Sequence, residues 1–232
     1  MKPTPFEYPK NAAVGKVVHK NRIYKQAGLT PATKKLFIRQ VEQIVWEFKL
    51  APETVNIKST IAVPEIQIFS ISLKTGELNS NVLRCIDLAI PFPIIFELRF
   101  DDKLRLAASY KRPSDADATK SILSDYFFGE WIPYESPRKP LPIVFDLEIL
   151  YSQILAPLFP YVLESDESLI ELVERMESIR RLKRDIERCS AKLQKEKQFN
   201  RKVEINAALR KLTHDLEVLT GTSRPTDSGI ST

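Results

Sequence analysis

Two runs of apolar residues at helical spacing, with a cationic segment between them, dominate the last third of the chain. The first run comprises Leu172, Met176, Ile179, Leu182, Ile186, Cys189 and Leu193, and the second comprises Ile205, Leu209, Leu212, Leu216 and Leu219. Because Leu193 and Ile205 are twelve residues apart, one straight helix would place the two runs about 120° apart. The pattern instead predicts two helices joined by a turn between Lys195 and Lys202, forming an antiparallel, coiled-coil-like hairpin.

The rest of the chain is long enough for one further domain. A chain of 232 residues suits a medium domain with an appendage, since domains commonly run about 100 to 150 residues. We expect an α+β globular domain over residues 1–163, the helical hairpin over residues 164–221 and a disordered polar tail over residues 222–232. Ser165 is expected to cap the first hairpin helix.

The predicted elements of the first domain mix helices and strands. Thr30 and Pro31 are a helix start signal, and apolar residues at helical spacing extend this helix to about Leu50. Residues 1–29 show no clean period and are expected to form a loop. The remaining elements are a strand over 65–73 with a bulge at Phe69, a helix over 77–90, a strand hairpin over 93–100 and 104–110, a strand over 122–128, a proline-rich connector over 132–142 that resists regular structure, and a helix over 144–156. This order is typical of an α+β domain.

Composition and motifs disfavour several kinds of active site. Six glycines against sixteen prolines disfavour glycine-rich phosphate loops, and the chain contains no GxSxG, P-loop or GxGxxG motif. Its histidines, His19 and His214, and its cysteines, Cys85 and Cys189, have no spacing that suits zinc. We therefore expect no metal and no cofactor.

The sequence indicates a soluble cytoplasmic protein. The N-terminal segment lacks the apolar core of a signal peptide, and no stretch approaches the roughly 18 to 20 apolar residues of a membrane span. Cys85 and Cys189 are far apart in predicted helices, which is typical of buried thiols in a reducing compartment.

One acidic pattern has the outline of a restriction-type nuclease core. Asp87 is followed ten residues later by Glu97, Leu98 and Arg99, and Glu65 lies on another predicted strand. Carboxylates of this kind hold Mg²⁺. Arg99 stands where such cores carry lysine, and arginine is always protonated, so it cannot serve as a base. The alternative interpretation makes Glu97 an outward strand residue paired with Arg105 or Lys111.

The segment between the two apolar runs is strongly basic. Residues 180–202 hold ten cations against three acids, within a chain of net charge +5. The candidate binding residues are Arg180, Arg181, Lys183, Arg184, Arg188, Lys192, Lys195, Lys197, Arg201 and Lys202, together with Phe199. Residues 1–40 are also basic, with nine cations against Glu7. Both segments would attract a polyanion, although a solvated face balanced by acids elsewhere is the other interpretation.

Phe199 is the apolar residue within this basic segment. It could stack on a base or fill a partner's pocket. We expect it instead to fold back and seal the end of the hairpin.

Several segments together resemble a bacterial and archaeal family, the domain of unknown function numbered forty-three ninety-one. They are residues 44–57 (IVWEFKLAPETVNI), 64–69 (PEIQIF), 90–98 (IPFPIIFEL), 110–113 (YKRP) and 195–204 (KEKQFNRKVE). The resemblance implies a genomic context beside DNA methyltransferases and helicase or restriction-type ATPases of anti-phage defence. It implies no catalytic residue.

These observations favour a non-catalytic accessory subunit of a methyltransferase and helicase complex, as in restriction-modification, that contacts DNA or a partner subunit through the basic hairpin. A Mg²⁺-dependent nuclease that uses Asp87, Glu97 and perhaps Glu65 is one alternative. The other is a self-associating structural module, because an apolar run can pair with a second copy of the chain.

Overall fold

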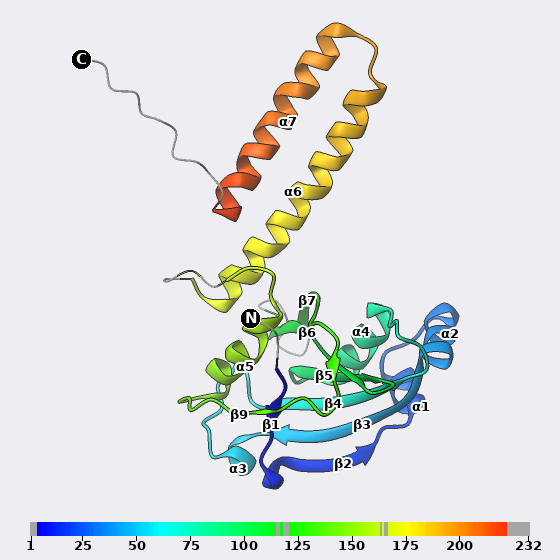
Figure 1. The fold of residues 1–232 in the computed structure, drawn as a ribbon, viewed down its shortest axis with the longest axis vertical. Helices are drawn as coiled ribbons and strands as arrows, with labels where there is room; N and C mark the ends of the chain where they lie inside the picture. The colour runs from blue at the N-terminus through cyan, green and yellow to red at the C-terminus, as the bar shows by residue number, and fades with distance from the viewer. Residues whose placement is uncertain (1–3, 115–116, 118–120, 163, 165–166, 222–232) are drawn as a thin grey trace, which may run out of the picture. The chain divides into compact units, whose positions relative to one another are not determined.

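The chain folds into two compact units, Met1–Val162 and Leu163–Thr232. The computed structural model describes residues 4–114, 117, 121–162, 164 and 167–221 (Figure 1). The first unit contains a mixed sheet with helices, and the second is a helical hairpin, which confirms the α+β class with a C-terminal hairpin. The tail predicted over residues 222–232 lies outside the described residues.

A seven-stranded sheet organises the first unit. Its strands are β2 (Ala13–Val17), β3 (Val41–Leu50), β4 (Ile66–Leu73), β5 (Ile94–Phe100), β6 (Lys103–Pro113), β7 (Ser121–Phe128) and β8 (Ile132–Pro133). The order is β2-β3-β4-β5-β6-β7, and β8 pairs with β6. Only β4 and β5 run parallel within this sheet. A separate parallel pair joins β1 (Phe6–Glu7) to β9 (Lys139–Pro140).

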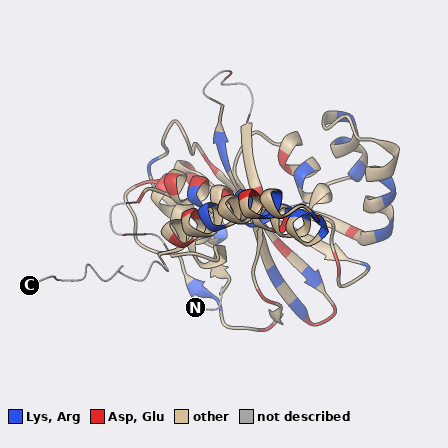
Figure 2. Ribbon diagram, turned by 90° about the horizontal axis from the view of Figure 1, so that it is seen from above, with Lys and Arg blue, Asp and Glu red and all other residues tan. Residues whose placement is uncertain are grey.

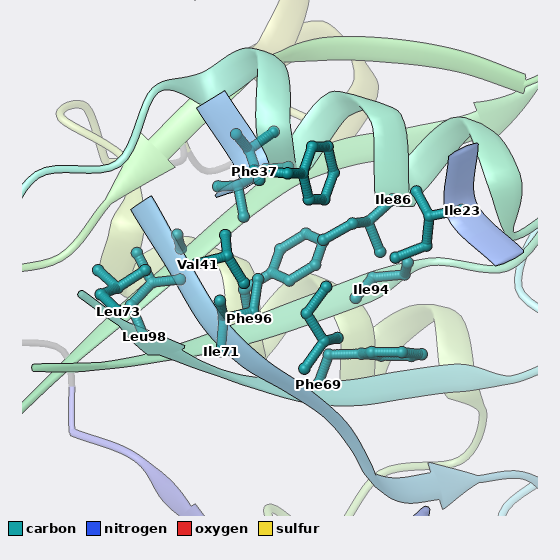
Figure 3. Packing of buried hydrophobic residues seen from close by; sticks show 14 residues of the cluster. Ile23, Phe37, Val41, Phe69, Ile71, Leu73, Ile86, Ile94, Phe96 and Leu98 are labelled. Atoms are coloured by element: carbon teal, nitrogen blue, oxygen red, sulfur yellow. The ribbon is translucent and has the colours of Figure 1, made fainter. Parts of the chain in front are cut away.

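Three helices cover one face of the sheet: α1 (Lys20–Gln26), α2 (Pro31–Gln40) and α4 (Ser80–Ala89). Phe37 of α2 and Ile86 of α4 pack over the inward side chains of β4 and β5, including Phe69 and Phe96 (Figure 3). Burial of this cluster stabilises the unit, since each large apolar side chain contributes about 1.5–3 kcal/mol when it leaves water.

The opposite face is covered by α5 (Leu147–Leu155), which continues into a 3₁₀ turn, η2 (Ala156–Leu158). Tyr151 of α5 stacks on Tyr110 of β6, with 6.1 Å between ring centroids. The Tyr151 hydroxyl donates to the Ser109 carbonyl at 2.8 Å, so α5 is fixed to the strand backbone. Two short elements, η1 (Lys10–Ala12) and α3 (Pro52–Val55), complete the unit.

The helix predicted from Pro31 to Leu50 is half wrong. It ends at Gln40, and β3 begins at the next residue. The second half is rich in β-branched and aromatic residues, which favour strands. Irregular register between Val41 and Gln43, and again between Trp46 and Phe48, breaks the alternation of the strand. The apolar side chains therefore recur at spacings that resemble a helix.

Several smaller expectations also need correction. Residues 1–29 hold β1, η1, β2 and α1 rather than a loop. The irregularity expected at Phe69 lies in the partner strand β3, and the proline-rich connector contains the short strands β8 and β9. The predicted β4, α4, β5–β6 hairpin, β7 and α5 are confirmed.

The second unit consists of α6 (Leu169–Lys195) and α7 (Phe199–Thr220), joined by a three-residue turn. Ser168 caps α6 in a reciprocal arrangement with Glu171, whereas the cap predicted at Ser165 lies outside the described residues. The two helices pack along their apolar runs, and Cys189 Sγ lies 3.6 Å from the Ile205 carbonyl oxygen. The predicted antiparallel hairpin and its turn are confirmed.

One arginine ties the two ends of this hairpin together. The Arg175 guanidinium binds the Glu167 carboxylate at 2.6 and 2.7 Å and donates to the Leu219 carbonyl at 3.4 Å. The start of α6 and the end of α7 are thereby joined. Gly221 closes α7 in the left-handed conformation, with φ of 66°, which glycine adopts without steric cost.

Candidate functional site

Asp87, the first nuclease candidate, is enclosed in a hydrogen-bonded cluster beneath α4. Its side chain is 1% exposed, and Lys111 Nζ lies 3.2 Å from Oδ1. Oδ2 accepts from the Ser109 hydroxyl at 3.3 Å and from the Tyr126 hydroxyl. Burial raises the pKa of the Asp87 carboxyl.

Lys111 holds the C-terminal end of α4. Its Nζ donates to the carbonyls of Asp87 and Ile90 at 2.6 Å each, and to that of Phe92 at 3.0 Å. Burial lowers the pKa of Lys111. A cation at a helix C-terminus complements the helix dipole, so Lys111 acts as a structural cap as well as the counter-ion of Asp87.

Glu97 lies on the opposite face of the sheet from Asp87. Its neighbours Phe96 and Leu98 belong to the core under the helices, and side chains alternate along a strand. Glu97 is 2% exposed, and Arg138 binds its two oxygens at 2.7 and 2.9 Å. The expectation of an outward Glu97 paired with Arg105 or Lys111 is wrong.

Arg105 and Lys111 are engaged elsewhere. Lys111 holds Asp87, and the Arg105 Nε donates to the Gly129 carbonyl at 2.7 Å. The Arg105 guanidinium also lies 4.9 Å from the centroid of the Phe128 ring. The partner of Glu97 comes from the proline-rich connector, far away in the sequence, so strand pairing alone could not have identified it.

Glu65 completes the nuclease candidates and has its own cation, with Oε2 3.1 Å from Lys49 Nζ. The structure does not bring Asp87, Glu97 and Glu65 together. Within the described part of the chain, no group of three His, Cys, Asp or Glu residues is placed to hold a metal ion.

The acid that does approach the Glu97-Leu98-Arg99 segment is Glu47 of β3. Its Oε1 lies 3.0 Å from Arg99 Nη2 and accepts from the Ser70 hydroxyl at 2.5 Å. Sequence analysis missed this contact because Glu47 was assigned to a helix. A correct assignment of this segment to a strand would have placed Glu47 in β3, across β4 from Arg99, and so would have suggested the contact.

The hairpin carries an exposed row of cations along α6, which we call the cationic stripe. Its members are Arg181, Arg184, Arg188, Lys192 and Lys195. They recur every three or four residues on the side of α6 away from its apolar run, so they share one helix face. The stripe spans fourteen residue steps, or about 21 Å at the α-helical rise. Arg188 is also bonded to Asp185.

The turn adds cations at an electrostatically unfavourable place. The Glu196 carboxylate accepts the backbone N–H groups of Gln198 and Lys197 at 2.9 and 2.8 Å, and these bonds lower its pKa. Arg201 and Lys202 follow near the positive end of α7, whose first turn holds no acid. Cations there oppose the helix dipole, and the Glu196 carboxylate, whose pKa Arg201 and Lys202 also lower, offsets part of that repulsion.

Phe199 does not fold back to seal the hairpin, contrary to expectation. Its side chain is 77% exposed, and Val203, one turn later, is 54% exposed. The physical reason is that α7 begins at Phe199 itself, which directs this face of the helix away from the apolar run. The tip thus presents an apolar pair beside the cations.

The comparisons with known proteins identify the family. The chain matches the model of the domain of unknown function (DUF4391) over residues 6–216, so the protein belongs to that family. Neither the curated proteins nor the solved structures contain a match. None of the described helices is long and apolar enough to cross a membrane.

Proposed function

We propose that the protein is a non-catalytic accessory subunit of a methyltransferase and helicase complex of the restriction-modification or anti-phage defence kind, and that its basic hairpin contacts DNA. A partner subunit with an acidic surface is the other ligand that suits the tip. The exposed cationic stripe is the observation that carries this proposal. The genomic context implied by the family resemblance supplies the kind of complex.

The chemistry of the first unit supports a non-catalytic role. Each carboxylate of the nuclease pattern is already paired with a cation, and two of them lie on opposite faces of the sheet. A Mg²⁺-dependent nuclease needs convergent carboxylates with free coordination positions.

The form of the stripe supports a nucleic-acid ligand. Its cations are long, exposed and in a row, which suits the repeated phosphates of a DNA backbone. Binding of this kind releases counter-ions, so the observed affinity falls with salt by a logarithmic slope of roughly 0.9 per neutralised phosphate. Phe199 would add stacking on an unpaired base.

Self-association through the apolar runs is less well supported. The runs of α6 and α7 already face each other within one chain, and Arg175 joins the two ends of the hairpin. Pairing with a second copy through the same residues would require the hairpin to open.

Charge reversal on the stripe tests the proposal. The variant Arg181→Glu with Lys192→Glu is compared with Arg210→Glu with Lys211→Glu, which makes the same change of charge on α7. We expect the stripe variant alone to lose DNA binding in fluorescence anisotropy, with an unchanged melting temperature. Equal DNA affinity of the two variants would refute a DNA-binding stripe.

Affinity purification of the tagged protein from its host, with and without nuclease treatment, tests the complex. Recovery of a methyltransferase or helicase that survives nuclease treatment is the expected result. Recovery of no such enzyme would refute the role of an accessory subunit.

A further inference from the structure

The outward surface of α1, α2 and α4 in the first unit carries charges of one sign. We call it the helix-layer surface, and its exposed cations are Arg22, Lys25, Lys34, Lys35, Arg39 and Arg84. The three helices contain a single acidic residue, Asp87, which is buried against Lys111. Figure 2 shows Lys and Arg distributed over these helices.

Packing between the helices gathers these cations into one surface. Tyr24 of α1 meets Phe37 of α2 edge to face, with 5.4 Å between ring centroids. Lys34 of α2 places its Nζ 5.9 Å from the centroid of the Tyr24 ring. Both α1 and α2 pack on α4. Cations that are far apart in the sequence therefore lie on adjoining helices.

These charges are unpaired in the described part of the chain, where none of the six cations has an acidic partner in an ion pair. Other cations of the same unit have acidic partners, as Arg99 and Arg138 show. Uncompensated like charges on neighbouring helices repel one another, and an external polyanion would remove that repulsion.

We propose that the helix-layer surface binds the phosphate backbone of duplex DNA without reading its sequence. Six separate cations on three helices suit a ligand whose negative charges repeat over a broad area. An anionic membrane fits less well, because a membrane-bound helix layer presents a large apolar face beside its cations. Here the exposed large apolar residues on the three helices are Ile38 and Leu88.

This surface belongs to a different unit from the hairpin, so the inference does not rest on the hairpin's proposed role. The two surfaces are tested by separate variants, so a failure of one proposal leaves the other standing.

The experiment compares two triple variants of the full-length protein. The first, Lys25→Glu with Lys34→Glu and Arg39→Glu, alters the helix-layer surface. The control, Lys58→Glu with Lys103→Glu and Lys139→Glu, makes the same change of charge at exposed cations elsewhere in the first unit. DNA affinity is measured by fluorescence anisotropy over a series of salt concentrations, and circular dichroism verifies folding. A milder variant, Lys25→Gln with Lys34→Gln and Arg39→Gln, repeats the test if the first is unstable.

We expect the first variant to bind duplex DNA at least about tenfold more weakly than the control. We also expect the logarithmic slope of DNA affinity against salt concentration to become shallower by roughly two to three. Each phosphate contact contributes roughly 0.9 to this slope, and three cations are altered. The same affinity and slope in both variants would overturn the proposal. So would unchanged DNA binding together with lost binding to vesicles of phosphatidylserine, which would assign the surface to membranes.

Discussion

Two buried acids in the first unit each form their shortest ion pair with a cation from a distant part of the sequence, and Glu97 also lies 3.8 Å from Arg99 Nη2. Lys111 reaches Asp87 on one face of the sheet, and Arg138 reaches Glu97 on the other. Removing one member of such a pair leaves an uncompensated buried charge, which costs more than the pair contributes. At the scale of single residues, these cations fix α4 and the proline-rich connector to the sheet.

The variant Asp87→Ala distinguishes a structural acid from a catalytic one. It leaves the Lys111 ammonium without its carboxylate, so we expect the free energy of unfolding to fall by about 3–5 kcal/mol. Urea denaturation measures this change. Unchanged stability together with loss of a metal-dependent DNA cleavage would instead restore the nuclease interpretation.

The variant Arg138→Ala should also destabilise the fold. Glu97 would lose both of its short contacts and keep Arg99 Nη2 at 3.8 Å, and the Phe6 carbonyl would lose a donor at 3.0 Å. We expect a loss of about 1–3 kcal/mol, whereas Arg138→Ala combined with Glu97→Leu should recover much of it. A double-mutant cycle on unfolding free energies checks this, and additive losses would contradict the pairing.

At the scale of elements, the base of the hairpin depends on Arg175. Arg175→Ala removes a two-bond contact with Glu167 and a contact with the end of α7. We expect it to destabilise the hairpin by about 1–3 kcal/mol. Hydrogen exchange should show faster exchange at the start of α6 and the end of α7, and equal rates in the parent and the variant would refute the role.

The same contact predicts a dependence on pH. The hydrogen bonds from Arg175 lower the pKa of Glu167 below its usual value of 4.5. A carboxyl with a lowered pKa in the folded state adds stability that is fully present above its unfolded pKa and is lost as the pH falls through its folded pKa. Below about pH 4.5 the parent should therefore approach the stability of Arg175→Ala, as measured by thermal melts at a series of pH values.

The elements also show what the sequence could reveal. The helical hairpin was predictable because its apolar runs are long and regular. The helix α4 and the β5–β6 hairpin were predictable because their apolar residues recur at the helical period and the strand period, respectively. The α2–β3 junction was not, because irregular register in β3 places its apolar residues at helix-like spacings. The cationic stripe could be read from the chain, whereas the partners of Asp87 and Glu97 depend on tertiary contacts between distant segments.

At the scale of the whole molecule, the chain combines buried, paired charges in the first unit with two exposed cationic surfaces, on which Arg188 alone has an ion pair among the described residues. Exposed ion pairs contribute little to stability, so cations on these surfaces can be changed with small effects on folding. Stability and binding should therefore respond to different substitutions.

A combined charge-reversal variant checks this separation. A chain that carries Arg181→Glu and Lys192→Glu together with Lys25→Glu, Lys34→Glu and Arg39→Glu should melt within a few degrees of the parent, because these positions are exposed. Its DNA binding should be weaker than that of either set alone. A melting temperature far below that of the parent would show that the surfaces also support the fold.

Because Arg175 joins Glu167, before the start of α6, to the end of α7, the length of the hairpin beyond Arg175 is independent of that contact. Removing seven residues from each helix, between Arg175 and the turn, would shorten the hairpin by about 10 Å. The contacts of Arg175 with Glu167 and Leu219 would be kept. Each deletion of seven residues would rotate the apolar run by only about 20°, so the two helices could still pack. Such variants would vary the length of the hairpin and keep its packing. A graded series of arm lengths would then report how far the tip must reach to meet what it binds.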